Sequence, residues 1–137
     1  MELPVILFLS GVAGVFAGML NNAAAPFFAH ADTRVAWRKQ SWLVQLASIG
    51  THLLWSLALG WLFWLSWGLT AIVSVAWWWR GLCFAAIAWV AACAPLLLDQ
   101  ALHARLSWRL LAQSAWNSFV VCFATSLACA WSWGGGR

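Results

Sequence analysis

The stretch from Trp42 to Trp79 contains no Lys, Arg, Asp or Glu. At about 1.5 Å per residue, a helix over this stretch is too long for one crossing of a hydrocarbon core of roughly 30 Å. Across the whole chain, 7% of residues are charged and 65% are apolar, against about 25% and 45–50% in soluble domains. So few polar groups cannot cover a soluble surface. The sequence therefore predicts an all-α integral membrane bundle, because helices satisfy their own backbone hydrogen bonds in lipid.

The apolar runs divide into four predicted transmembrane helices within one domain, residues 1-137. Ser66 and Gly68 break the long run and end the second span. The first run is interpreted as a span rather than a cleaved leader, because it exceeds the roughly 7–15 apolar residues of a leader and follows Glu2. The segment 69–79 either starts span three or forms a short interfacial helix before it. The predicted spans are 3-28, 41-65, 81-98 or 69-98, and 110-133.

The basic residues predict how the bundle is oriented. Five of them lie in the first and third loops, and only Arg80 lies in the second; the five are Arg34, Arg38, Lys39, Arg105 and Arg109. The positive-inside rule then places loops one and three in the cytoplasm and both termini outside. We expect a bacterial inner membrane. These charges are too few and too scattered for a nucleic-acid partner.

The 14 tryptophans fall into two predicted bands, as interfacial rings do. The inner band contains Trp37, Trp42, Trp108 and Trp116. The outer band contains Trp61, Trp64, Trp67, Trp77, Trp78, Trp79, Trp131 and Trp133. Only Trp55 and Trp89 are expected near the middle of the membrane.

The outer band includes the unusual sequence AWWWRG. Its residues Trp77, Trp78, Trp79 and Arg80 form either a simple interfacial anchor or an outer docking surface for a lipid or a partner helix. The choice depends on whether Arg80 is interfacial or buried in the membrane.

Small residues recur at helical spacing in two spans. Gly14 and Gly18 form a GxxxG match, which permits close approach of two helices. The last span carries a ridge of small residues at intervals of four: Ser114, Ser118, Cys122 and Ser126, followed by Ala130. We predict helix packing at both faces, with the tightest contacts among spans one, two and four.

Polar residues in the spans are costly in lipid and normally face another helix or a cavity. His52 is expected near the midplane, and five others gather in the predicted cytoplasmic half: Asn21, Asn22, Gln45, Gln113 and Asn117. One interpretation is a polar pocket with His52 at its head. The other is a set of hydrogen bonds between helices, each worth about 1 kcal/mol or less.

Several kinds of chemistry are disfavoured. Glu2, Asp32 and Asp99 all lie at ends or in loops, so no predicted span holds a carboxylate for a coupled ion site. His52 is the one histidine inside a predicted span, so a haem held by two histidines is not expected. There is no metal-ligand cluster or phosphate loop in the sequence. We expect no cofactor and no enzymatic activity.

Residues 94–131, APLLLDQALHARLSWRLLAQSAWNSFVVCFATSLACAW, resemble the second half of a family of small four-helix bacterial membrane proteins of unknown function. The shared features are a Pro near the end of span three, a short loop with an Arg, and an apolar last span that ends in Trp. The first span fits the family loosely, without its Trp-Tyr pair, and 69–79 resembles an insertion. The resemblance implies a fold and no activity.

Two functions follow as expectations. The first is a non-enzymatic accessory or interaction protein of the membrane, assembling laterally as a homo-oligomer or as a subunit of a larger membrane complex. The second is a binding or transport protein for a small apolar or amphipathic molecule. In that case a lipid, quinone or pigment would bind at His52, with Asn117 as a second polar anchor.

Overall fold

The computed structural model describes the backbone of residues 3–28, 42–66, 76–103 and 108–134, and their side chains apart from 25–28 and 103. The elements are α1 (Leu3–Phe28), α3 (Trp42–Leu65), α5 (Trp77–Ala88), the π-helical segment η1 (Trp89–Cys93), α6 (Ala94–His103) and α7 (Trp108–Gly134). Four helical stretches are long and apolar enough to cross a membrane: Leu3–Ala24, Trp42–Leu65, Trp77–Leu102 and Trp108–Gly134. The prediction of an all-α membrane bundle of four helices is confirmed.

The third crossing begins at Trp77, between the two starts that the sequence left open. Ala76 has an extended backbone, with φ −54° and ψ 144°, and its carbonyl accepts the first helical hydrogen bonds from the N–H groups of Trp79 and Arg80. The three tryptophans therefore form the first turn of α5. Residues 67–75 lie outside the described part of the chain, so the interfacial helix stays a prediction.

A widened turn interrupts the third crossing. In η1 the N–H of Ala94 donates to the carbonyl of Trp89, five residues earlier. Pro95 gives the physical reason, because it has no N–H and its ring crowds the carbonyl four residues before it. A π-turn just before the proline relieves that crowding and keeps the helix continuous into α6.

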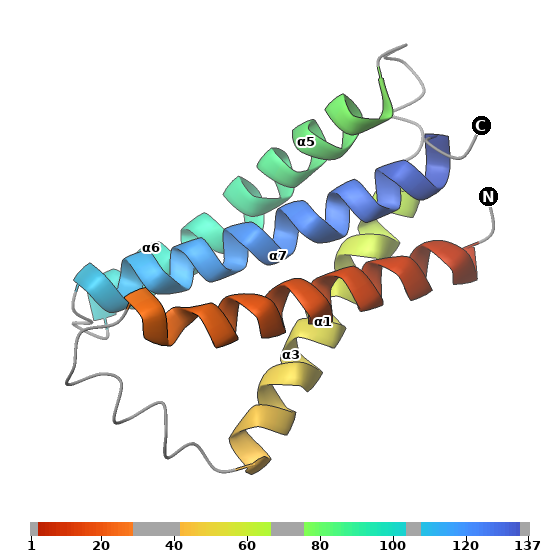
Figure 1. The fold of residues 1–137 in the computed structure, drawn as a ribbon. Helices are drawn as coiled ribbons and strands as arrows, with labels where there is room; N and C mark the ends of the chain where they lie inside the picture. The colour runs from red at the N-terminus through yellow and green to blue at the C-terminus, as the bar shows by residue number, and fades with distance from the viewer. Residues whose placement is uncertain (1–2, 29–41, 67–75, 104–107, 135–137) are drawn as a thin grey trace.

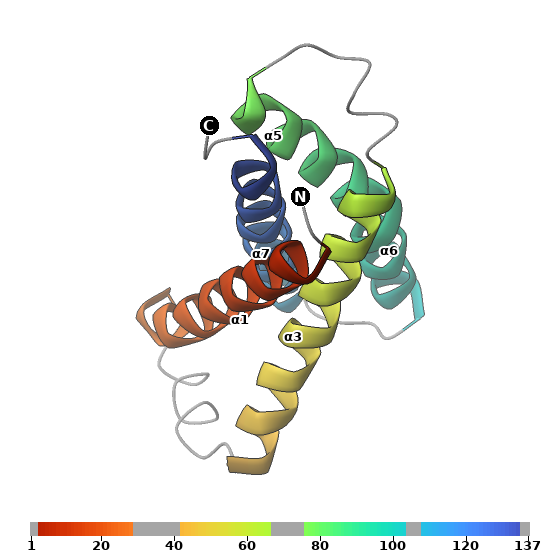
Figure 2. The same ribbon diagram turned by 90° about the vertical axis from the view of Figure 1, so that its right-hand side faces the viewer.

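The helices form a bundle around α7. α1 and α7 lie side by side, α3 crosses them obliquely, and α5 with α6 packs along another side of α7 (Figures 1 and 2). The start of α1 and the end of α7 lie at the same end of the molecule (Figure 1). The first turns of α3 diverge from the bundle, and residues 42–47 are all exposed.

A packed core closes the end of the bundle where α1 starts and α7 ends. Its buried residues are Ile6, Phe63, Cys129 and Ala130, and the partly buried Trp64, Trp77, Phe84 and Trp133 pack against them. The Phe63 ring meets Phe84 edge-on, with ring centroids 5.0 Å apart. Three tryptophans of the predicted outer band therefore fill the core as well. This packing accounts for much of the crowding of tryptophan at that end.

Candidate functional site

The contact between α1 and α3 has a regular register of four residues. Successive levels bring together Ser10 with Gly60, Gly14 with Ser56, and Gly18 with His52, while Asn22 donates to Ser48 Oγ over 3.2 Å. Residues four apart form a ridge on a helix, and interdigitated ridges of this kind give an oblique crossing. The predicted small face of span one is thus occupied by α3.

Gly14 lies where three helices meet. A Cβ at this position would be 2.5 Å from Ser56 Cβ and 2.8 Å from Thr125 Oγ1. Thr125 and Ser56 are fully buried, and the Thr125 hydroxyl donates to Ser56 Oγ over 3.3 Å. The sequence did not predict a contact at Thr125. Thr125 lies one turn after the buried Val121, on the same face of α7.

Four of the six polar residues of the predicted pocket contact a neighbouring helix: Asn21, Asn22, His52 and Asn117. Asn21 Nδ2 donates to Asn117 Oδ1 over 2.8 Å and joins α1 to α7. The His52 ring lies against Gly18, where a Cβ would be 2.5 Å from His52 Cδ2. Gln113 is half-buried, and Gln45 is exposed on the diverging end of α3. Gln45 therefore lies apart from the Asn21–Asn117 pair.

The ridge of small residues on α7 faces α5. Cys122 Sγ donates to the carbonyl of Ala85 over 3.5 Å, and a Cβ on Gly81 would be 3.0 Å from Ala130 Cβ. Ser126 is fully buried, whereas Ser114 is exposed. The expectation that spans one, two and four make the tightest contacts was wrong in part, because α5 packs on α7 more extensively than α3 does.

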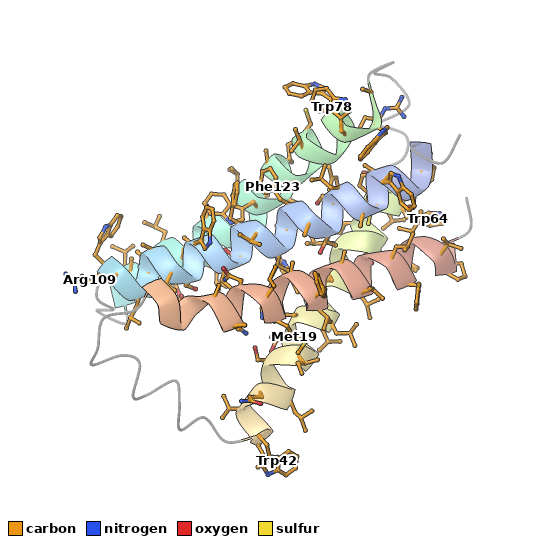
Figure 3. The ribbon with its side chains drawn as sticks, in the orientation of Figure 1. Met19, Trp42, Trp64, Trp78, Arg109 and Phe123 are labelled. Carbon is orange, nitrogen blue, oxygen red and sulfur yellow. The ribbon has the colours of Figure 1, made fainter. Side chains whose placement is uncertain are left out.

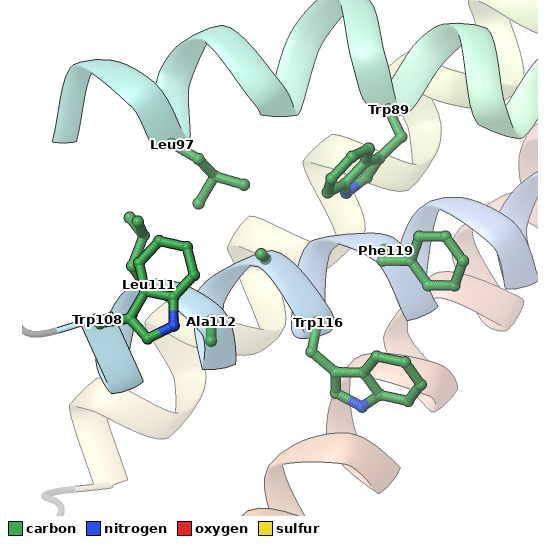
Figure 4. Close-up of a pocket in the computed structure, with 8 residues that line it drawn as sticks. Trp89, Leu97, Trp108, Leu111, Ala112, Trp116 and Phe119 are labelled. Carbon is green, nitrogen blue, oxygen red and sulfur yellow. The ribbon is translucent and has the colours of Figure 1, made fainter. Parts of the chain in front are cut away.

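An aromatic groove opens between α7 and the η1–α6 segment. We use the name aromatic groove for the cavity of about 490 Å³ lined by Trp89, Leu97, Trp108, Leu111, Ala112, Ala115, Trp116 and Phe119 (Figure 4). Most of these residues come from α7, Leu97 comes from α6, and Trp89 comes from η1. Ala112 and Ala115 leave space between the larger side chains, and the groove is open on the side where Trp108, Ala112 and Trp116 are exposed.

The rings at the head of the groove contact one another. Trp116 and Phe119 are stacked, with centroids 5.9 Å apart and planes at 20°, and Trp89 meets Phe119 edge-on at 6.0 Å. The Trp89 indole N–H donates to Ser118 Oγ over 3.1 Å, and that hydroxyl donates to the Ala115 carbonyl. The one hydrogen-bonding group of Trp89 is thus satisfied, so the ring offers the groove an apolar surface.

No lining residue of the groove carries an acid, a base or a nucleophile. The arrangement offers an open apolar surface on which a hydrocarbon chain or a flat apolar ring can pack, and its lining offers no group for acid–base catalysis. The sequence did contain a pattern for this face, because Trp108, Ala112 and Trp116 follow one another at intervals of four. The preference of tryptophan for membrane interfaces accounts for the same residues, so the sequence did not distinguish a groove from an interfacial band.

The predicted outer docking surface divides in two. Trp77 is half-buried against the core, whereas the exposed fractions of Trp78 and Trp79 are 49% and 48%. Figure 3 shows Trp78 projecting away from the bundle at the start of α5 and Arg109 at the opposite end. Arg80 lies in the first turn of α5 and is half-buried.

Within the described ranges, no three His, Cys, Asp or Glu side chains come together as a metal site. The four cysteines are free thiols, three of them buried, with Cys83 exposed. The chain matches no family model, no curated protein and no solved structure. The resemblance of residues 94–131 to small four-helix bacterial membrane proteins therefore stays a prediction.

Proposed function

We propose that this is a non-enzymatic membrane protein that binds the hydrocarbon part of an amphipathic lipid in the aromatic groove. The groove is the observation that carries the proposal. Its volume of about 490 Å³ falls within the roughly 300–1,000 Å³ of small-molecule sites. The small-residue faces first expected to serve lateral assembly are occupied by neighbouring helices of the same chain, which favours binding over assembly.

The chemistry of the lining favours a lipid chain over a quinone or a pigment. A quinone carbonyl needs a hydrogen-bond donor, and the central metal of a pigment needs an axial ligand. All eight lining residues are apolar or aromatic, and the Trp89 N–H is already used by Ser118. A hydrocarbon chain needs neither a hydrogen-bond donor nor an axial ligand. For the same reason we place the ligand in the groove rather than at His52, whose ring packs on Gly18.

A second candidate function is assembly with another membrane protein or with a second copy of this chain. The observation in its favour is Gln45, an amide exposed on the diverging half of α3 within a membrane-spanning helix. Such a side chain normally faces another helix. The mass of the purified protein in mild detergent tests this function: Gln45→Leu should shift an oligomer or complex toward the single chain, and an unchanged mass would argue against this surface.

We further propose a bacterial inner membrane, with loops one and three in the cytoplasm and both termini outside. The placement of the start of α1 and the end of α7 at one end of the bundle supports an even number of crossings (Figure 1). Reporter fusions at either terminus, active only on the outer side, test the orientation. Activity of cytoplasmic reporters at those positions would overturn it.

The test of the groove is to fill it. Ala112→Trp places a large ring inside the lining, and Ala86→Trp adds the same ring at an exposed alanine of α5 outside it. The proteins would be purified in mild detergent and their retained lipids measured by native mass spectrometry and absorption. We expect the wild type and Ala86→Trp to retain one colourless lipid that Ala112→Trp loses.

Two results would refute the proposal. Equal lipid retention by Ala112→Trp and Ala86→Trp would show that the groove is not the binding site. A coloured or quinone-type molecule released by Ala112→Trp would show that the site is right and the ligand class is wrong. A folded helical spectrum and an unchanged thermal transition establish that either variant is suitable for the comparison.

A further inference from the structure

Arg80 is the basic side chain of α5 and is only partly accommodated by the described part of the protein. Arg80 lies in the first turn of a membrane-spanning helix and is half-buried. Its Nε is buried without a hydrogen-bond acceptor among the described residues. Nε is therefore covered by the protein, and a further acceptor has to pair with the two terminal nitrogens.

Among the residues that the structure describes, no carboxylate lies at the end of α5 where Arg80 stands. In the ranges that the structure describes, the one carboxylate is Asp99, which lies in α6 at the far end of the same crossing. A guanidinium at the edge of a hydrocarbon layer needs an anionic acceptor, because an unpaired charge in that setting is costly. We expect that acceptor at the two terminal nitrogens, since Nε is covered.

The neighbouring rings define the surface that such an acceptor would meet. Trp78 and Trp79 are both about half exposed and meet edge-on, with ring centroids 5.7 Å apart and planes at 78°. Trp77 points the other way and is held by the core, where a Cβ on Gly134 would be 3.2 Å from Trp77 Cβ. Trp77 is thus held by the core, and the two exposed indoles that follow it lie beside the Arg80 cation. A cation next to exposed tryptophan rings is typical of a membrane interface.

We propose that Arg80, with Trp78 and Trp79, binds the headgroup of one anionic phospholipid at the end of the bundle where α5 starts. The two Nη groups donate to two oxygens of the lipid phosphate, end-on, because Nε is covered. Paired N–H donors that match a phosphate are the particular strength of arginine. The indoles pack on the glycerol and the first methylenes of the lipid.

This site is separate from the aromatic groove. The groove is formed by residues of η1, α6 and α7, and its far end is lined by Trp108, the first residue of α7. Arg80 lies at the other end of the bundle, where α5 starts. Loss of one site should therefore leave the other intact, and the two proposals can fail independently.

The experiment titrates lipid onto delipidated protein in detergent and counts bound molecules by native mass spectrometry. Phosphatidylglycerol is the probe, and phosphatidylcholine is the neutral reference. We expect Arg80→Gln to weaken the tightest phosphatidylglycerol site about tenfold, as loss of a charge-assisted pair does. Arg80→Lys should fall between the wild type and Arg80→Gln. The matched control is Arg109→Gln, which removes an exposed arginine from the first turn of α7 and should bind like the wild type.

Three outcomes would overturn the proposal. One is unchanged phosphatidylglycerol binding in Arg80→Gln, and another is an equal loss in Arg109→Gln, which would reduce the effect to overall charge. The third concerns Glu2, which lies outside the described residues. If Arg80→Gln and Glu2→Gln lower the thermal transition equally and leave lipid binding unchanged, the acceptor of Arg80 is that carboxylate and no lipid is held.

Discussion

Gly14→Ala should destabilise the bundle more than any comparable change at another glycine that the structure describes. The added methyl would lie 2.5 Å from Ser56 Cβ and 2.8 Å from Thr125 Oγ1, whereas ordinary contact begins at 3.4 Å. Both neighbours are fully buried, and Ser56 belongs to α3 while Thr125 belongs to α7. No single side-chain rotation can clear the space, so α1 has to move away from two helices at once.

The size of the effect follows from three contributions. A shift of roughly 1 Å loosens the packed interface, and overpacking of this kind costs about 1–3 kcal/mol. Separation of Thr125 from Ser56 forfeits about 0.6 kcal/mol, the average for hydrogen bonds between membrane helices. Replacing a helical glycine by alanine returns about 0.5–1 kcal/mol. We therefore expect a net loss of about 1–3 kcal/mol.

Gly50→Ala is the matched control. It makes the same substitution in α3, but a Cβ at Gly50 would meet nothing within 4 Å. Only the gain in helix propensity applies there, so this variant should be as stable as the wild type or slightly more stable. The assay is reversible unfolding by dodecyl sulfate in mixed micelles, followed by far-UV circular dichroism, with the two variants compared at the same micelle composition.

A compensating exchange strengthens the test. Gly14→Ala combined with Ser56→Gly moves one Cβ from α3 to α1 and should recover a large part of the stability lost in Gly14→Ala alone. Equal unfolding curves for Gly14→Ala and Gly50→Ala would refute the reasoning. So would a double variant whose loss is simply the sum of its two parts, because the clash between Gly14 and Ser56 would then not be the cause.

Two smaller effects should follow from single hydrogen bonds. Asn117→Leu leaves Asn21 without its 2.8 Å acceptor and should lower the free energy of unfolding by about 0.6–2 kcal/mol. Gln113→Leu on the same helix is the control. An equal loss of stability in both variants would contradict a specific role for the Asn21–Asn117 pair. Trp89→Phe removes the N–H that bonds Ser118 over 3.1 Å while keeping an aromatic ring at the groove. It should lower stability by about 0.6 kcal/mol with lipid retention unchanged, and loss of the lipid would show that the indole itself is needed.

The sequence predicted the crossings well because the cost of charge in lipid leaves little freedom over where spans can lie. It also predicted which residues share a face, as for Gly14 and Gly18, because helical spacing fixes the face directly. It could not predict which neighbour that face meets. The tightest contacts were expected among spans one, two and four, whereas the ridge through Ser118 and Cys122 lies against the third crossing, at Trp89 and Ala85.

The aromatic groove was missed for a different physical reason. A tryptophan near a membrane interface is favoured whether or not it lines a cavity, so position alone could not separate Trp116 from Trp131. The groove depends on the path of α6 past Pro95 and on the small side chains of Ala112 and Ala115. Both depend on how two helices pass each other, which the pattern along one helix does not determine.

Three of the four levels between α1 and α3 pair a glycine with a larger side chain, and this selects a single translational alignment of the two helices. Sliding α3 by one turn in one direction would press Ser10 onto Ser56, and sliding it in the other would press Ser10 onto Trp64. Either slip also separates Asn22 from Ser48. The alignment is thus encoded in side-chain size rather than in the length of the segment that connects the helices. We expect the pair to find the same alignment even when α1 and α3 are supplied as separate polypeptides.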